Sequence, residues 1–525
     1  MAKVLEHESA GIVPDTEAFR LRRFVERLVQ AGAAEIRDEP TDLIDVADAL
    51  DGNAKAVWFR RAGPEEAELV GNVNASRDRL AMAFDTTPGE LRAEVLRRVA
   101  TPQPVIEVTS ADAPVHRIVL RGEDADLTRF PIHLQHGLDG APYISASLDY
   151  AVDPVNGWTN TGCRRLMLRG RHETGIDLVA PSDLKAIYEA SAARGENLPV
   201  SFSVGAHPID HVAATMRVPT DEMELLARLR GAPLGVVRCV TNDVRVPADA
   251  EIIIEGYLDG GGHVEAEGPY GEFLGYYGLV KHNPLFHVTA ITMRDDALFQ
   301  TSTIGGRQMA ETDTANLCAV RTEATVWRAL ETAVREPVAV YSNPANGGAF
   351  NVRIALRQRV PGEARNAIAA AMGSLANLKN VFVVDDDIDI FSDQEMDWAL
   401  ATRFQPDRDL VVQSGFRTLP LDPSLGGART GSKAGYDLTL PLGERPLEYT
   451  VPAPPVLDGA RFASVRAALE DGPKTFCQLM AALGSRDGRD VAIALDEVRR
   501  SGSLDRTQDG VYRLAVAPAS KGPRS

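Results

Sequence analysis

Residues 116–325 carry many short apolar or alternating segments, among them VHRIVL, YISASLDYAV, PVSFSVG and EIIIEG. Turn residues separate these segments, and only two helical patterns, near residues 182–194 and 220–230, interrupt them. Short strands at this spacing are typical of a β-sandwich or a β-barrel. We therefore predict a β-rich central domain, and the rest of the chain must be organised around it.

Helical and strand-like patterns alternate on the N-terminal side of this region. Residues 1–115 hold two amphipathic helix patterns, at 15–33 and 86–100, with short strand-like pieces between them. Asp15 or Thr16 is the expected N-cap of the first helix. We predict a small α/β domain over this segment.

The C-terminal part of the chain shows a similar alternation. Helical patterns and the apolar run NVFVVDDDIDIF predict a second α/β domain over residues 326–455. The Pro-rich segment 451–459 is typical of a linker. Residues 460–525 predict three helices followed by two strands around an Asp-Gly turn, which together resemble a winged-helix module. Because the charges of this tail nearly balance, we expect it to pack or oligomerise and not to bind DNA.

The balance of charge limits the partners of the protein. The chain has 74 acidic and 56 basic side chains, a formal net charge of −18, which argues against nucleic acid or an anionic membrane as the main partner. The four cysteines form no CxxC pair, so we expect reduced thiols. The first residues lack the layout of a signal peptide, and no apolar run approaches the roughly 18 residues of a membrane span. We expect a cytoplasmic protein.

The segment HVEAEGPYGEFLGYYG, residues 263–278, places Glu267 and Glu272 on either side of Gly-Pro-Tyr-Gly. These four residues fit a β-turn with proline at its second position, which would fold the chain back and bring the two carboxylates together. Two close carboxylates cannot both ionise cheaply, and the apolar residues that follow would add to this cost. One of them would then stay protonated near neutrality and could act as a general acid. The alternative is a solvated acidic hairpin.

A second segment, DPVNGWTNTGCRRLMLRG at residues 153–170, enters a strand with two adjacent arginines. Side chains of adjacent strand residues point to opposite faces, so either Arg164 or Arg165 could face inward. An inward arginine would need a carboxylate partner, and the two glutamates of the turn are the obvious candidates. The alternative is a pair of surface arginines on an edge strand.

A third segment, MRVPTDEMELLARLRG at residues 216–231, begins a helix with Thr220 as its expected cap. Asp221 and Glu222 lie in the first turn, where acids favour the helix dipole. Alternatively, one of them binds a hard cation such as Mg²⁺ or Mn²⁺. Asn160 in the preceding segment is a neutral oxygen donor that is weak as a metal ligand by itself.

These motifs occur in one order: NTGCRR, PVSFSVGAHP, MRVPTDE, CVTNDVRVPADAEIIIEG and EAEGPYGEFLGYY. Their order and wording resemble the UbiD family of reversible decarboxylases, which use prenylated FMN. The resemblance covers residues 10 to about 445 and includes MDWALATRFQPDRD and GSKAGYDLTLP. It implies a UbiD-like α+β and α/β multidomain fold, in which residues 116–325 form a split β-barrel that binds the flavin. Residues 326–455 would be the α/β oligomerisation domain, and the winged-helix-like tail lies outside the common core.

The resemblance also implies roles for single residues. Arg165, Glu267 and Glu272 match the family's catalytic triad, with Glu272 as the proton donor. A divalent metal, Mn²⁺ or Mg²⁺, would be bound by Asn160, Asp183 and Glu222, with K⁺ nearby. The residues expected at the cofactor are Asn160, Thr161, Gly162, Cys163, Arg164, Arg165, Ser182, Asp183, Thr215, Met216, Glu222 and Arg403.

The metal site departs from the family pattern at one position. Many relatives have a histidine where this chain has Asp183. An aspartate can bind Mn²⁺ or Mg²⁺ through oxygen. The alternative is that Asp183 is only the N-cap of the helix that begins with LKAIYEA.

By resemblance, the protein is a carboxy-lyase that reversibly decarboxylates an aromatic, heteroaromatic or α,β-unsaturated carboxylic acid. A flavin prenyltransferase would supply the cofactor, CO₂ would be the second product, and the protein would form a homodimer or homohexamer. Cys163, Tyr436 and residues 273–277 and 301–306 are expected around the substrate. The alternatives are a metal-dependent hydrolase built on the three predicted metal ligands, and a non-catalytic protein that binds or assembles the cofactor.

Overall fold

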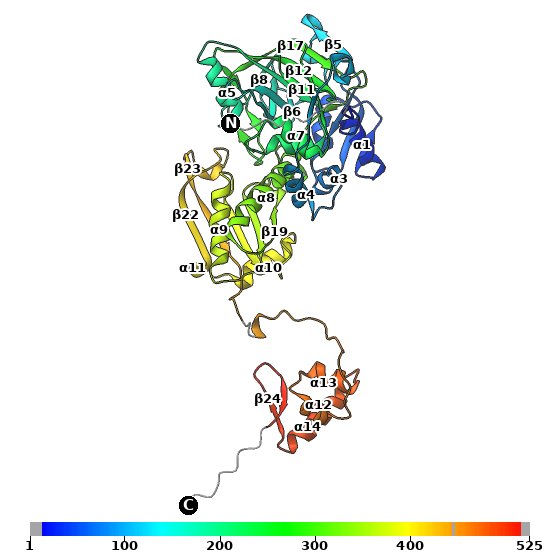
Figure 1. Ribbon diagram of the computed structural model, residues 1–525, viewed down its shortest axis with the longest axis vertical. Coiled ribbons are helices and arrows are strands. Elements are labelled where there is room, and N and C mark those ends of the chain that lie inside the picture. The colour runs from blue at the N-terminus through cyan, green and yellow to red at the C-terminus, as the bar shows by residue number, and fades with distance from the viewer. Residues whose placement is uncertain (1–12, 444–446, 516–525) are drawn as a thin grey trace, which may run out of the picture. The chain divides into compact units, whose positions relative to one another are not determined.

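The computed structural model describes residues 13–443 and 447–515. The chain divides into two compact units, Met1–Thr439 and Leu440–Ser525, whose helices and strands are drawn in Figure 1. The first unit contains an N-terminal sheet, a β-barrel and a C-terminal sheet. The second unit contains helices and a two-stranded sheet.

The N-terminal sheet has four strands in the order β1-β2-β3-β18. Strands β1 and β2 are parallel, β2 and β3 are antiparallel, and β3 and β18 are parallel. The strands are β1 (Ala34–Arg37), β2 (Ala56–Ala62), β3 (Ala67–Gly71) and β18 (Phe299–Gln300). The helices of this segment are α1 (Leu21–Gln30), α2 (Leu43–Leu50), α3 (Arg77–Ala83) and α4 (Leu91–Val99). Because β18 follows the barrel in the chain, this sheet joins residues from both sides of the barrel.

Helix α1 begins later than the sequence predicts, and its N-cap residue is Arg20. The carboxylate of Asp15 instead accepts hydrogen bonds from the backbone N–H groups of Glu17 and Ala18, at 2.9 and 3.1 Å. Asp15 therefore closes a turn that precedes the helix. The prediction of Asp15 or Thr16 as the helix cap is wrong.

Six strands close into a barrel in the order β12-β9-β6-β7-β8-β17, because β17 pairs back with β12. All of these pairings are antiparallel. The strands are β6 (Tyr143–Val152), β7 (Thr159–Leu168), β8 (Glu173–Ile176), β9 (Leu198–Val204), β12 (Ile252–Leu258) and β17 (Leu285–Met293). A further strand, β5 (Ile118–Arg121), also pairs with β17. The predicted β-barrel is confirmed.

Three helices, not two, interrupt the barrel strands: α5 (Asp183–Ala192), α6 (Pro208–Thr215) and α7 (Glu222–Arg230). The sequence did not indicate α6, because residues 208–214 are all buried and therefore show no polar stripe. A small sheet of β4 (Val105–Glu107), β10 (Leu234–Arg238) and β11 (Arg245–Pro247) completes this region. The buried guanidinium of Arg230 on α7 pairs with Asp210 on α6 and with Asp249, both at 2.6 Å. These ion pairs fix α7 against α6.

The C-terminal sheet has five strands in the order β19-β20-β21-β23-β22. The three central strands are parallel, and each edge strand is antiparallel to its neighbour. The strands are β19 (Pro337–Ser342), β20 (Asn351–Leu356), β21 (Asn380–Asp385), β22 (Leu410–Arg417) and β23 (Thr430–Asp437). The helices are α9 (Glu363–Ser374), α10 (Asp393–Arg403) and α11 (Pro406–Asp409). Strand β21 is the buried strand expected in NVFVVDDDIDIF.

One 21-residue helix, α8 (Asp313–Ala333), belongs to two cores. Leu317 and Val320 in its first half pack in the core of the N-terminal helices, whereas Val326 and Leu330 pack in the core of the C-terminal sheet. The domain border predicted at residues 325 and 326 therefore falls inside a continuous helix, where its apolar partners change. Neither α8 nor any other helix in residues 13–443 and 447–515 is both long and apolar enough to cross a membrane.

The second unit has the secondary structure that the sequence of the tail predicts. Its helices are α12 (Val465–Asp471), α13 (Phe476–Leu483) and α14 (Arg489–Arg500), and its strands are β24 (Leu504–Arg506) and β25 (Tyr512–Leu514). The two strands are antiparallel, and Lys474 adds a bridge to Tyr512. Helix α13 begins with a capping box of Thr475 and Gln478. The order of helices and strands is that of a winged helix.

Closure of the barrel requires a residue without a side chain at position 256. Gly256 lies on β12, where its pairing with β17 is irregular. A Cβ atom on Gly256 would lie 1.9 Å from the carbonyl oxygen of His287 and 2.7 Å from the ring of Phe286. We expect Gly256→Ala to lower the free energy of unfolding by about 3 kcal/mol, because the closing strands must separate to admit the methyl group. Urea denaturation of the full chain measures this effect.

Gly170→Ala is the matched control, because a Cβ atom at residue 170 would meet nothing within 4 Å. Its expected change is within about 0.5 kcal/mol. Equal unfolding midpoints for the two variants would contradict the importance of the close approach between β12 and β17.

Candidate active site

A hairpin inserted between barrel strands β12 and β17 carries both glutamates of the EAEGPYGEF motif. Its strands are β13 (Glu265–Glu267), β14 (Tyr270–Gly271), β15 (Tyr277–Gly278) and β16 (Lys281–Asn283). Strand β13 pairs with β16, and β14 pairs with β15, in both cases antiparallel. Because β12 and β17 are themselves paired, the hairpin leaves the barrel at the seam where the barrel closes.

The hairpin reverses over residues 272–276. The backbone N–H of Glu272 donates to the carbonyl of Tyr276, and the N–H of Gly275 donates to the carbonyl of Glu272, both at 2.9 Å. Residues 268 and 269 instead connect β13 to β14 on the same arm of the hairpin, and residues 270 and 271 form β14. The predicted β-turn at Gly-Pro-Tyr-Gly is therefore wrong, and the reversal of the chain lies just beyond it.

Arg165 on strand β7 binds both glutamates at once. Its Nε and Nη2 donate to the two carboxylate oxygens of Glu267 at 3.0 and 3.2 Å, and its Nη1 donates to Oε1 of Glu272 at 2.9 Å. The neighbouring Arg164 points to the opposite face, where its Nε lies 3.1 Å from a carboxylate oxygen of Asp149. The geometry thus decides the choice that strand alternation left open, since Arg165 is the arginine that meets the glutamates.

Two further charges join this cluster, and sequence reasoning missed both. Asp177, just after β8, lies 3.0 Å from Nη2 of Arg165 and 3.0 Å from Nζ of Lys281. The same Nζ lies 3.5 Å from Oε1 of Glu272. Lys281 stands opposite Glu267 in the pairing of β13 with β16, so the correct hairpin register would have predicted it.

Burial and charge together fix the protonation of two members of the cluster. Burial alone would raise the pKa of Asp177, but Arg165 and Lys281 outweigh it and hold that pKa below 3.8. Burial would lower the pKa of Arg165, but Glu272 and Glu267 outweigh it and raise that pKa well above the usual value of an arginine. Arg165 is therefore a permanent cation between two carboxylates, of which Glu267 is 0% and Glu272 is 6% exposed.

The segment before barrel strand β6 holds the hairpin from the other side. The carboxylate of Asp139 accepts hydrogen bonds from the N–H of Gly271 at 2.9 Å and from the N–H of His136 at 3.0 Å, and it lies 3.0 Å from Nδ1 of that histidine. The hydroxyl of Tyr270 donates to Oε1 of Gln135. The Tyr270 ring also lies 4.5 Å from the guanidinium carbon of Arg165. The two residues that precede Glu272 are thus fixed, Gly271 through its backbone N–H and Tyr270 through its side chain.

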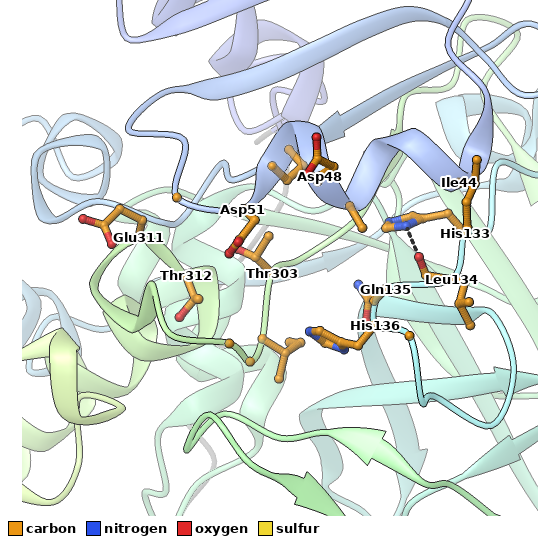
Figure 2. A pocket seen from close by; sticks show the side chains of 17 residues that line it. Ile44, Asp48, Asp51, His133, Leu134, Gln135, His136, Thr303, Glu311 and Thr312 are labelled. Atoms are coloured by element: carbon orange, nitrogen blue, oxygen red, sulfur yellow. Dashed lines mark hydrogen bonds between the residues drawn. The ribbon is translucent and has the colours of Figure 1, made fainter.

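A cavity of about 370 Å³ borders this segment. Figure 2 shows labelled side chains from helix α2, from residues 133–136 and from the loop that begins at Thr303 around it. Of the predicted substrate-lining residues, 303–306 line this cavity, whereas Cys163 and Tyr436 do not. Tyr436 instead stacks on Phe382, with ring centroids 4.5 Å apart.

A second cavity, of about 240 Å³, lies beside strand β7. It is lined by all the predicted cofactor residues except Arg165 and Arg403, that is by Asn160, Thr161, Gly162, Cys163, Arg164, Ser182, Asp183, Thr215, Met216 and Glu222. Helix α8 supplies further lining residues, Thr314, Leu317, Cys318 and Arg321. These predicted residues come from three separate segments of the sequence, and the structure brings them together around one cavity.

Arg403 does not reach this cavity. It lies at the end of α10, and its guanidinium donates to the two carboxylate oxygens of Asp387 at 2.9 and 2.8 Å. It also lies 3.6 Å from the carboxylate of Asp385. In this structure, Arg403 is held within the C-terminal sheet region by its aspartate partners.

The three predicted metal ligands share the 240 Å³ cavity and offer oxygen atoms. Burial raises the pKa of Glu222 to about 7, and the charges of Asp149 and Asp183 add to this effect. Burial also raises the pKa of Asp149 to about 6, and Asp149 accepts a hydrogen bond from the side-chain amide of Asn160 at 3.0 Å. Acids crowded in this way favour a bound cation, and an oxygen-only set fits a hard divalent ion. No group of three His, Cys, Asp or Glu side chains with metal-binding geometry occurs in the described residues.

The helix caps next to these acids differ from the predictions. Ser182, not Asp183, caps α5, and its hydroxyl accepts a hydrogen bond from the N–H of Lys185 at 3.2 Å. Asp221, not Thr220, caps α7, through a bond from the N–H of Met223 at 2.8 Å. The alternative that Asp183 is only an N-cap is therefore wrong, and its carboxylate is not engaged in capping.

Residues 106–308 match the UbiD 3-octaprenyl-4-hydroxybenzoate carboxy-lyase Rift-related domain, and residues 315–438 match the C-terminal domain of the same family. The chain is 31% identical over 430 residues to an anhydromevalonate phosphate decarboxylase of Methanosarcina mazei, covering 81% of this chain and 97% of the relative. The chain belongs to the UbiD family of carboxy-lyases. The expected carboxy-lyase class is confirmed at this level.

Solved structures agree with this placement. The UbiD-class enzyme HmfF from Pelotomaculum thermopropionicum, in complex with FMN, has a TM-score of 0.78 and 31% identity, and the match covers 83% of this chain and 97% of HmfF. Apo 3,4-dihydroxybenzoic acid decarboxylase (AroY) from Klebsiella pneumoniae has a TM-score of 0.74 and 27% identity, with 83% and 98% covered. The family domains end at residue 438, so the winged-helix-like unit lies outside them.

The variant Asp177→Asn tests whether the charge of Asp177, a residue outside the sequence motifs, stabilises the fold through its ion pairs. Because the pKa of Asp177 in the folded protein lies below 3.8, its ion pairs stabilise the fold at neutral pH. This stabilisation is lost as the pH falls through the lowered pKa of the folded state. We expect the variant to be less stable than the wild type at pH 7, and the difference to shrink below pH 3.8. Urea unfolding midpoints across this pH range measure it.

Asp243→Asn is the control, because the side chain of Asp243 is 100% exposed and lies 3.8 Å from its partner Arg238. Exposed pairs of this kind contribute about 0–1 kcal/mol. A destabilisation by Asp177→Asn that stayed constant from pH 7 to well below pH 3.8 would show that the carboxylate charge is not its source.

Proposed function

We propose that the protein is a decarboxylase of an aromatic, heteroaromatic or α,β-unsaturated carboxylic acid that uses prenylated FMN and takes Glu272 as its proton donor. The observation that carries the proposal is the position of Arg165, which binds Glu267 and Glu272 together within a barrel whose neighbouring cavity gathers the predicted cofactor residues. Relatives and solved structures that are named decarboxylases or contain FMN or prFMN support it.

Glu272 is placed to move a proton at the end of the hairpin. Loss of CO₂ leaves an electron pair on the substrate carbon, and bound prenylated FMN would supply the electron sink for that pair. Protonated Glu272 then gives its proton to this carbon and becomes a carboxylate. Arg165 Nη1 and Lys281 Nζ, at 2.9 and 3.5 Å from Oε1 of Glu272, stabilise the new negative charge. A proton from water restores the acid for the next turnover.

Glu267 and Arg165 act in this proposal as positioning residues. Glu267 is fully buried, and its two carboxylate oxygens accept hydrogen bonds from Nε and Nη2 of the Arg165 guanidinium. A bidentate pair of this kind fixes the plane of the guanidinium. The remaining Nη1 is thereby aimed at Glu272. A Cβ atom on Gly278 would lie 2.6 Å from Oε1 of Glu272, so glycine at this position leaves room for the carboxylate beside Arg165.

The second cavity fits a flavin nucleotide with a divalent ion. Asn160, Asp183 and Glu222 would hold Mn²⁺ or Mg²⁺ through oxygen, and Thr215 and Met216 would lie near K⁺. A flavin prenyltransferase would supply prenylated FMN. We further propose a homodimer or homohexamer, which the solved structure of an evolved dimeric form of HmfF supports. Because the chain belongs to a carboxy-lyase family, we favour this function over a metal-dependent hydrolase or a non-catalytic assembly protein.

Activity is tested on protein co-expressed with a flavin prenyltransferase. CO₂ release is measured with 3,4-dihydroxybenzoate, vanillate and anhydromevalonate phosphate, the acids in the names of the relatives. We expect release from at least one acid, and we expect Glu272→Gln to lower kcat by about 10²-fold or more while the bound flavin stays unchanged, because the proton donor is lost. Bound flavin is read from its absorbance.

Glu265→Gln is the matched control on the same hairpin, because Glu265 is 41% exposed and pairs with Arg169 away from the triad. Its kcat is expected to stay near that of the wild type. Full activity in Glu272→Gln would exclude Glu272 as the proton donor. Wild-type protein that decarboxylates with metal but without flavin would exclude the flavin-dependent reaction.

A further inference from the structure

Helix α8 presents one face to the 240 Å³ cavity beside β7. Thr314, Leu317, Cys318 and Arg321 follow one another at spacings of three, one and three residues and all line the cavity. Side chains at these spacings share one face of a helix. Residues 160–164 of strand β7 line the same cavity. Arg321 is therefore a cavity residue from a part of the chain that none of the sequence motifs included.

The guanidinium of Arg321 has buried nitrogen atoms without partners. Its Nε and Nη2 are both buried, and neither has a hydrogen-bond partner within residues 13–443 and 447–515. Buried polar groups of folded proteins are nearly always paired, and an unpaired one calls for a ligand or an ordered solvent molecule. A permanently charged guanidinium makes this need stronger, because burying an unpaired charge is costly.

The other arginines that line this cavity have partners. Arg164 lies 3.1 Å from the carboxylate of Asp149. Arg217 donates to the carbonyl of Pro181 at 3.4 Å. The Nε atom of Arg164 is also buried without a hydrogen bond, but the carboxylate of Asp149 balances its charge. Arg321 differs from both arginines because it has two buried donors without a hydrogen bond and no ion-pair partner among the described residues. The hydroxyl of Thr161, which lines the same cavity, is also buried without a partner.

A negatively charged group of a bound ligand, other than the reacting carboxylate of the substrate, would supply the partner that the guanidinium of Arg321 lacks. Arg165, Glu267 and Glu272 do not line this cavity, so a carboxylate that reacts beside Glu272 belongs elsewhere. The oxygen donors of Asp183 and Glu222 on the same cavity suit a cation, which leaves the anionic group of the ligand to Arg321. In a flavin mononucleotide, that group is the phosphate.

We propose that Arg321 binds the phosphate of the flavin mononucleotide through its guanidinium, with the hydroxyl of Thr161 as a second donor. The proposal rests on the flavin dependence proposed above and adds a phosphate ligand from α8. The planar guanidinium matches two phosphate oxygens at once, which a lysine cannot do. Because α8 continues into the core of the C-terminal sheet, phosphate binding would also connect the cofactor to that part of the fold.

The test compares FMN with riboflavin, which has the same ring system and no phosphate. The full chain is freed of flavin and titrated with each compound, and quenching of flavin fluorescence gives the two dissociation constants. We expect Arg321→Gln to weaken FMN binding about 30-fold, or about 2 kcal/mol, and to leave riboflavin binding unchanged. Arg321→Lys should recover part of the loss. Thermal unfolding of each variant confirms that it is folded.

Arg328→Gln is the matched control, because Arg328 lies on the same helix and is exposed. It should change neither dissociation constant. If Arg321→Gln keeps the wild-type ratio of FMN to riboflavin affinity, the assignment of Arg321 is overturned while the flavin dependence stands. If the wild-type chain binds neither compound, the flavin dependence itself fails.

Discussion

The buried ion cluster around Arg165 is the interaction on which the rest of the structure depends. A guanidinium and a fully buried carboxylate are costly to remove from water, and loss of one partner from such a pair costs about 3–5 kcal/mol. The fold must therefore deliver Glu267 and Glu272 to Arg165 accurately. It does so because Arg165 belongs to β7 of a closed barrel, and the hairpin of the glutamates leaves that barrel where β12 and β17 close it.

Around this cluster, each contact limits the motion of the hairpin differently. Asp139 holds the backbone of Gly271, Gln135 holds the hydroxyl of Tyr270, and Lys281 reaches Glu272 from the partner strand. Beyond these contacts, two backbone hydrogen bonds, from Glu272 N–H to Tyr276 and from Gly275 N–H to Glu272, close the turn at the end of the hairpin. Glu272 thus sits at the boundary between a fixed arm and the end of the hairpin, which suits a group that receives a proton from solvent and passes it inward.

Much of this architecture was predictable, and the failures have physical causes. Short apolar runs separated by turn residues revealed the barrel, and strands such as β6, β9 and β12 are indeed buried along nearly their whole length. Helix α6 was missed because it is buried on all sides. Thr220 was misassigned because it stands next to Asp221, and local sequence does not rank two adjacent capping residues. Asp15 was misassigned because the hydrogen bonds that it accepts close a turn before the helix and not the helix itself. Alternation separated Arg164 from Arg165 without saying which faces inward, and Lys281 and Asp177 depend on a pairing register that forms only in the fold.

The central claim is that Glu272 carries the proton to and from the carbon that loses CO₂. The most direct test of this claim measures how fast the hydrogen on that carbon exchanges with solvent. The flavin-loaded enzyme is incubated with the decarboxylated product in D₂O, and proton NMR monitors the loss of the hydrogen signal. The account predicts that the wild type incorporates deuterium at this carbon and that Glu272→Gln does so about 10²-fold more slowly or less. Exchange at the wild-type rate in Glu272→Gln would contradict it.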